Sequence, residues 1–169
     1  TQAKGLLKAF DVDCWVTFTR ESAINGDPAL AFLVGAPVTW HSAFVITKTG
    51  QTLAIVGKYD QITVQETGGY DEVIGYVEGV KAPFHTFMKE VNPATIAINY
   101  SEDSEICDGL THGMYLTLKS MLDEIGMGDR LIPAEKIVSA LRERKSQTEL
   151  DAIKQAIAHT QYIFERVTE

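Results

Sequence analysis

The sequence predicts a layered α/β domain built on a mixed sheet. Two observations predict it: strand-like and helix-like segments alternate along the chain, and one hairpin of neighbouring strands interrupts that alternation. A length of 169 residues fits one domain. A chain of this length buries roughly 70% of its unfolded surface without needing disulfides or metals.

The first half of the chain contains the clearest strands. Residues 14–19, CWVTFT, are rich in the β-branched and aromatic side chains that strands favour. Residues 42–48 and 51–57 are two apolar runs separated by a Thr-Gly turn, which predicts an antiparallel hairpin. Before the hairpin, Asp27 is suited to cap a short helix that starts at Pro28 and ends at Gly35.

The rest of the chain continues the alternation. Apolar residues at helical spacing predict helices, short β-branched runs predict strands, and Asn-Pro or Gly positions end the helices. The expected elements are a short helix in 59–66, a strand in 71–77, a helix in 81–91, a strand in 95–101, a helix in 111–126, and a short strand and then a helix in 129–145.

Composition narrows the class of protein. A formal net charge of -8 opposes binding to nucleic acid, whose phosphates attract basic surfaces. No apolar run approaches the ~18 residues of a membrane span, so no membrane partner is expected. Two cysteines, Cys14 and Cys107, are too few for a disulfide framework, which fits the cytoplasm. The chain begins without Met, and we expect it to be an excerpt of a longer protein.

The C-terminal segment starts as a well-capped helix. Residues 146–149, SQTE, form the S-x-x-E capping box, so a new helix is expected from Ser146. Its apolar face contains Leu150, Ile153, Ile157, Phe164 and Val167, which favours burial. Two alternatives remain for that face: it packs back onto its own domain, or the helix leads into a second domain.

The same segment carries a resemblance to a known family. Residues 141–160, LRERKSQTELDAIKQAIAHT, resemble the stretch that joins the N-terminal and catalytic domains in the creatinase/prolidase peptidases. The matching positions are Leu141, Arg142, Lys145, Ser146, Glu149, Ile153 and Ala156. Residues 19–35 and 96–118 also look like segments of that family, so the resemblance spans nearly the whole chain.

The resemblance implies both a fold and a role. The implied fold is a three-layer α/β domain with a mixed sheet of about five or six strands and a ribonuclease H-like motif. Residues 1–145 would be the N-terminal domain, and residues 146–169 would start a linker helix to a catalytic domain of the same chain. The family's divalent metal site belongs to that catalytic domain. No catalytic residue, metal ligand or cofactor is therefore expected in these 169 residues.

The whole protein would then be a metal-dependent aminopeptidase or Xaa-Pro dipeptidase-like hydrolase acting on small peptides, and it would form a homodimer. The alternative is a free-standing interaction or dimerisation domain without a peptidase partner. In the family, loops of the N-terminal domain help to wall a neighbouring active site. The expected substrate contacts are Trp40, His41 and Arg20, with Trp40 and His41 in a loop before a strand, where function often lies. The competing interpretation makes Trp40 a packing residue and His41 a solvent-facing one.

Two other groups of residues suggest metal chemistry less strongly. The densest group of potential metal ligands consists of Asp103, Glu105, Cys107, Asp108 and His112. Its spacing fits no established site, and a turn before a helix explains it more simply. A nuclease-like carboxylate site could be imagined from Asp11, Asp13 and Asp60, although the negative charge opposes it. Phosphate-loop, dinucleotide and G-x-S-x-G motifs are absent from the sequence.

Overall fold

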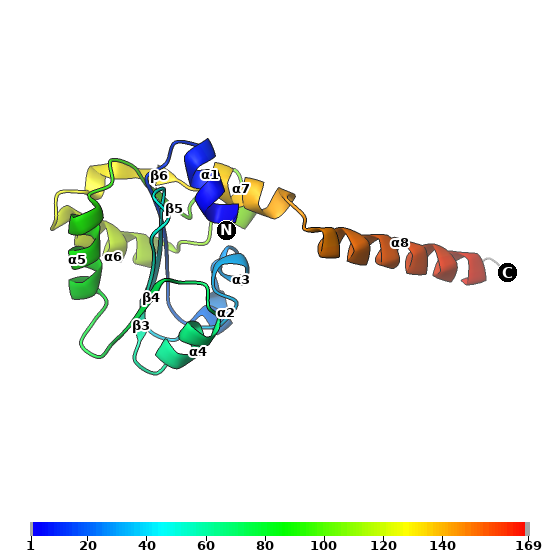
Figure 1. Ribbon diagram of the computed structural model, residues 1–169, viewed down its shortest axis with the longest axis horizontal. Coiled ribbons are helices and arrows are strands. Elements are labelled where there is room, and N and C mark those ends of the chain that lie inside the picture. The colour runs from blue at the N-terminus through cyan, green and yellow to red at the C-terminus, as the bar shows by residue number, and fades with distance from the viewer. Residues whose placement is uncertain (1, 168–169) are drawn as a thin grey trace.

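The structure, a computed structural model, describes residues 2–167. In that part of the chain six strands form one sheet in the order β4-β3-β2-β1-β5-β6 (Figure 1). β2 runs antiparallel to β1 and β3, and the other neighbouring pairs are parallel, which confirms the predicted mixed sheet and hairpin. The strands are β1 (Cys14–Thr19), β2 (Ser42–Thr47), β3 (Thr52–Gly57), β4 (Glu72–Tyr76), β5 (Ile96–Ile98) and β6 (Leu131–Pro133).

Helices cover both faces of the sheet, which makes three layers (Figure 1). α5 and α6 lie on one face, and α1, α3, α4 and α7 lie on the other. The helices are α1 (Gln2–Ala9), α2 (Ser22–Asn25), α3 (Leu30–Leu33), α4 (Gln61–Glu66), α5 (Lys81–Val91), α6 (His112–Asp123), α7 (Glu135–Glu143) and α8 (Gln147–Val167), with short 3-10 turns at Glu105–Cys107 and Gly128–Arg130.

The central strands are buried on both faces. Every residue of β1, β2 and β3 is buried. Because successive side chains of a strand point to opposite faces, Val16 and Phe18 join the core under α5 and α6, where Phe84 packs. Trp15 belongs to the opposite core, with Leu6 of α1. The sheet can be this apolar only because helices cover it on both sides.

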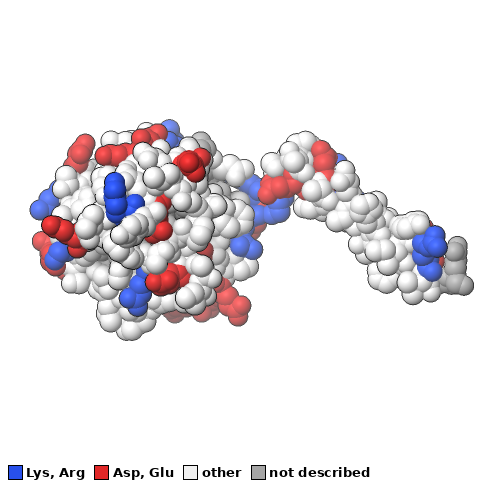
Figure 2. Space-filling model, turned by 90° about the horizontal axis from the view of Figure 1, so that it is seen from below, with Lys and Arg blue, Asp and Glu red and all other residues white. Residues whose placement is uncertain are grey.

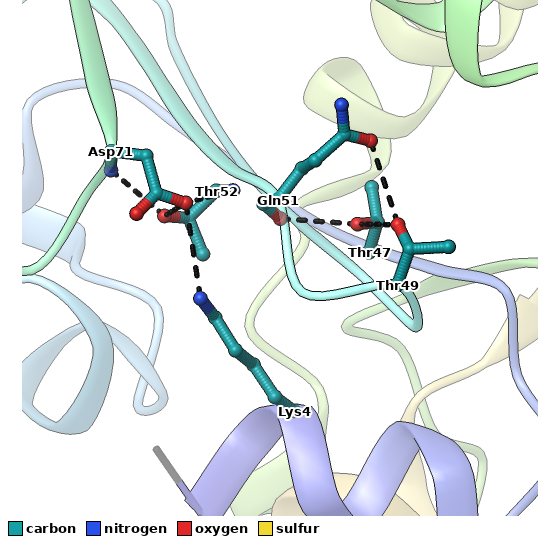
Figure 3. Close-up of polar contacts among 6 residues, drawn as sticks. All are labelled: Lys4, Thr47, Thr49, Gln51, Thr52 and Asp71. Carbon is teal, nitrogen blue, oxygen red and sulfur yellow. Dashed lines mark hydrogen bonds and ion pairs between the residues drawn. The ribbon is translucent and has the colours of Figure 1, made fainter.

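Polar contacts close the sheet edge at which β3 and β4 begin (Figure 3). The carboxylate of Asp71 accepts hydrogen bonds from the backbone N–H of Thr52 at 2.9 Å and from its hydroxyl at 2.8 Å. Lys4 of α1 lies 3.8 Å from the same carboxylate. The hydrogen bonds from Thr52 are the main reason that the pKa of Asp71 is lowered. This edge therefore ties the hairpin to α1 and to β4.

The segment around Asp27 differs from its prediction. We expected a helix that starts at Pro28 with Asp27 as its cap, but α3 begins at Leu30 with Ala29 as its N-cap residue. Asp27 accepts a hydrogen bond from the Ala29 N–H at 2.8 Å. Its side chain is buried. Gly35 follows α3 with φ 73°, the left-handed conformation expected after a helix.

α8 projects away from the body of the domain (Figures 1 and 2). The capping box is confirmed: the Ser146 N–H donates to Glu149 Oε2 at 2.7 Å, and the Glu149 N–H donates to Ser146 Oγ at 3.2 Å. None of the described residues of α8 is buried, so the alternative in which this helix packs back onto its own domain is wrong. Within residues 2–167, no helix combines the length and the apolar character that a membrane crossing requires.

Replacing Ser146 with Ala should fray the first turn of α8 without unfolding the domain. Loss of an N-cap side chain costs about 1 kcal/mol of helix stability, and α8 buries nothing against the body. Hydrogen exchange should therefore accelerate at the start of α8 while the thermal midpoint of the domain stays unchanged. The control is Leu118→Ala, which removes a fully buried side chain and should lower that midpoint. A lower midpoint for Ser146→Ala would contradict the independence of α8.

Candidate functional site

The candidate site lies at the edge of the sheet where the parallel strands end. In open α/β sheets, ligands bind outside the carboxyl ends of the strands. β1 ends at this edge with Thr19, which pairs with Ser42 at the start of β2. The connection between them, residues 20–41, therefore leaves the edge and returns to it. This brings Arg20, at one end of the connection, close to Trp40 and His41 at the other.

Backbone hydrogen bonds hold the two ends of this connection together. The Glu21 N–H donates to the carbonyl of Thr39 at 2.9 Å, and the Ser22 N–H donates to the carbonyl of Val38, also at 2.9 Å. The hydroxyl of Ser22 accepts the N–H of Val38 at 2.8 Å. These bonds extend the β1–β2 pairing beyond the sheet and hold the backbones of the two ends side by side.

Trp40 packs against Gly57, the last residue of β3. A Cβ atom at position 57 would stand 2.9 Å from Trp40 Cε3, so only glycine leaves room for the ring. The indole centroid is 5.8 Å from the rings of both Tyr59 and Tyr76. Trp40 keeps 37% of its surface exposed. The side chain is thus both packed on its inner side and open on its outer side.

The backbone around His41 is anchored by side chains from two other elements. Tyr76 Oη donates to the carbonyl of His41 at 2.8 Å, and Asp60 Oδ2 accepts the N–H of Thr39 at 2.9 Å. The His41 ring is half-buried, with its centroid 6.0 Å from that of Phe18. Burial first, and the positive charge of Arg20 second, lower the pKa of His41 below its ordinary value of 6.5. The lowered pKa favours the neutral form of the His41 ring.

These residues form one wall of an open groove of about 1090 Å³. Arg20, Trp40 and His41, the three predicted substrate-contact residues, all line it. The other side is formed by the segment after β4 and by the outer face of α6, with Val77 and Leu116 exposed. Lys81 and Glu124, which also line the groove, are paired at 3.2 Å.

Sequence reasoning missed this second wall. The exposed apolar side chains of Val77 and Leu116 stand 37 or more positions from Trp40 in the sequence, and no local pattern links them to it. One signal was present: Val77 ends the strand expected in residues 71–77, and Leu116 lies off the buried stripe of its helix, so both were candidates for an exposed apolar surface.

The other carboxylate groups take structural positions. Among residues 2–167, no three His, Cys, Asp or Glu side chains gather as a metal site would require. In the 103–112 segment, Cys107 is buried and contacts the hydroxyl of Ser139 at 3.5 Å. Asp11 and Asp13 both pair with Lys48, at the sheet edge opposite the groove. Asp60 lies instead at the groove, where it accepts the N–H of Thr39. Among the described residues, neither of the two groups considered from the sequence is brought together as one cluster.

Replacing Gly57 with Ala should displace Trp40. The added methyl group would collide with the indole, and overpacking of this kind costs about 1–3 kcal/mol. The emission maximum and the acrylamide quenching of Trp40 should change, while Trp15, only 1% exposed, gives a constant background. Gly5→Ala is the control, since nothing lies within 4 Å of its Cβ position. Unchanged quenching in Gly57→Ala would contradict the close approach of the Trp40 ring to Gly57.

The His41 ring should titrate below pH 6.5 in an NMR experiment. Above pH 6.5, the neutral His41 ring costs the folded state nothing relative to the unfolded chain. As the pH falls through the folded-state pKa, the free energy of unfolding decreases, because the unfolded chain binds the proton more readily. Arg20→Gln should raise the pKa of His41 only part of the way, since burial remains the larger cause. Lys48→Gln, at the opposite edge, removes the same charge and should leave it unchanged. An unaltered titration in Arg20→Gln would contradict the proximity of the two groups.

Comparison with known proteins identifies the fold. No protein-family model and no curated sequence matches the chain. Among solved structures, the X-Pro aminopeptidase of Thermotoga maritima matches with a TM-score of 0.65 and 17% identity over 98% of this chain and 42% of its own. The Xaa-Pro dipeptidase of Bacillus anthracis matches with a TM-score of 0.64 and 18% identity over 97% of this chain and 42% of its own.

An isolated domain matches as well. The N-terminal domain of the Xaa-Pro dipeptidase of Lactobacillus brevis has a TM-score of 0.55 and 15% identity, and the match covers 85% of this chain and 100% of that domain. Our chain thus spans less than half the length of the two longer peptidases. The resemblance read from the sequence is confirmed at the level of the fold: the chain has the fold of the creatinase/prolidase N-terminal domain, as found in Xaa-Pro aminopeptidases and dipeptidases.

Proposed function

We propose that this chain is the non-catalytic N-terminal domain of an Xaa-Pro peptidase-like metallohydrolase. The observation that carries the proposal is the fold, which is that of domains at the N-terminus of such peptidases. Residues 1–145 form the domain, and residues 146–169 begin the linker helix to a catalytic domain in the same chain. The protein acts in the cytoplasm, without a nucleic acid or membrane partner.

The extent of each match supports this division of the chain. The two longer peptidases match 98% and 97% of the chain, which includes most of α8. The isolated N-terminal domain from Lactobacillus brevis is matched over its whole length, yet it covers only 85% of our chain. The uncovered share is close to the length of the segment that starts at residue 146. This agreement in length supports the proposed boundary at residue 145.

In this proposal the groove forms part of the wall of an active site on a neighbouring catalytic domain, across a homodimer. The exposed face of Trp40 offers apolar surface to a small peptide. Arg20 adds a positive charge at the rim of a protein whose net charge is -8. A divalent metal in the catalytic domain would activate water and polarise the scissile carbonyl. The residues of this chain contribute position and shape to that site.

A second candidate function is a free-standing interaction domain. It is favoured by one observation: three apolar side chains of α8 are exposed, Leu150 by 40%, Ile153 by 44% and Ile157 by 53%. The reading frame after Glu169 separates the two candidates. Continuation into a segment with spaced Asp, His and Glu metal ligands supports the peptidase; a stop codon supports the interaction domain.

In the full-length protein, Trp40→Ala should lower kcat/KM for Xaa-Pro dipeptides by about tenfold, which corresponds to about 1.4 kcal/mol of lost transition-state binding. Phe32→Ala is the matched control, because Phe32 is an exposed aromatic residue outside the groove. Chelation of divalent metal should abolish hydrolysis in both variants, and the 169-residue chain alone should show none. Unchanged kinetics together with unchanged dimerisation in Trp40→Ala would remove the substrate-wall proposal.

A further inference from the structure

A buried polar network lies beneath the connection that forms the groove wall. Its members are almost fully enclosed: Asp27 is 4% exposed, Asn99 2%, and Trp15 and Thr17 1% each. Asn99 follows β5, Trp15 and Thr17 lie on β1, and Asp27 belongs to the connection of residues 20–41. The network therefore joins the connection to two neighbouring strands of the sheet.

The hydrogen-bond chemistry of the network allows one orientation of Asn99. The indole N–H of Trp15 can only donate, and it meets Asn99 Oδ1 at 2.6 Å. The Asn99 amide nitrogen must then donate its two hydrogens, to Thr17 Oγ1 at 3.2 Å and to Asp27 Oδ2 at 2.7 Å. Asp27 Oδ1 accepts the N–H of Ala29 at 2.8 Å. Every contact at Asp27 thus requires an acceptor oxygen.

Hydrogen bonds hold the carboxyl group of Asp27. Among residues 2–167, no lysine, arginine or histidine forms an ion pair with it. Gly109 closes over the group so tightly that a Cβ atom there would lie 2.3 Å from the carboxyl carbon. Burial raises the pKa of Asp27, although the hydrogen bonds from Asn99 and Ala29 oppose that shift. Burying a carboxyl group costs stability unless hydrogen bonds or an opposite charge compensate the lost hydration, and at Asp27 the hydrogen bonds from Asn99 and Ala29 take that role.

We propose that Asp27 is a positioning residue for the groove: through Asn99 it fixes the connection of residues 20–41 to the sheet and so sets where Arg20, Trp40 and His41 lie. The bonds near Glu21 and Ser22 align only the base of the connection. Asp27 ties its middle to the core, between the two ends that carry the groove residues. The functional importance of the positions of the three groove residues rests on the proposed function. The positions themselves can be measured directly.

An exchange of the two side chains tests the network. Asp27→Asn leaves only one acceptor oxygen where two are required, and Asn99→Asp places two carboxyl groups side by side. The double variant Asp27→Asn/Asn99→Asp again sets a donor against an acceptor at all four contacts, because the Thr17 hydroxyl can rotate to donate. Asp71→Asn is the matched control, a carboxyl-to-amide change at the opposite edge of the sheet.

The two tryptophans of the 169-residue chain, Trp15 and Trp40, report on the variants. In each single variant the Trp15 indole hydrogen should exchange about tenfold faster, since its acceptor is no longer fixed. Acrylamide quenching of Trp40 should increase in the same variants. Both readings should return towards wild type in the double variant, and Asp71→Asn should change neither.

Each outcome decides the proposal. Recovery in the double variant supports it, even where a single variant fails to fold. Single variants that are less stable but show unchanged Trp40 quenching would overturn it, because Asp27 would then act on stability alone. A double variant that is no better than the single variants would overturn it as well. If Trp40 moves as expected while Trp40→Ala leaves peptide kinetics unaffected, the proposed function fails and the role of Asp27 stands.

Discussion

The rest of the structure depends on the burial of the central sheet on both faces. β1, β2 and β3 expose no residue to solvent, so each face must be covered by helices and every connection must run around an end of the sheet. Most strands are parallel and end at the same edge. That edge is where loops can gather without disturbing the core, and the groove with Trp40 lies there.

The elements that the sequence predicted well are those with strong local patterns. The hairpin follows from two apolar runs around a Thr-Gly turn, and α5 and α6 follow from apolar residues at helical spacing. α1 was missed because its eight residues include Gly5, and glycine is a poor helix former. The helix at Pro28 was misplaced because Asp27, a good capping residue by type, has its strongest contacts with Asn99, 72 positions away. No local rule reaches across that separation.

The candidate site was predicted on one side only. The loop with Trp40 and His41 was singled out because it precedes a strand, where function often lies, and because loops of this domain wall a neighbouring active site in the family that the sequence resembles. The opposite wall and the buried network depend on tertiary packing. The same reasoning explains how the fold can match at 17% identity without any family match: a core tolerates many apolar substitutions if volume and patterning are kept.

The central claim is that the groove of this domain faces the metal site of a neighbouring catalytic domain. Paramagnetic broadening measures that proximity directly, using the full-length protein labelled with fluorotryptophan and loaded with Mn²⁺ as the probe metal. Trp40 lines the groove and serves as the probe. Trp15, which is buried in the core that the sheet forms with α1 and α7, serves as the internal reference. The account predicts that Mn²⁺ broadens the Trp40 resonance strongly and the Trp15 resonance much less. Equal broadening of the two signals, or a Trp40 signal that Mn²⁺ leaves sharp, would contradict it.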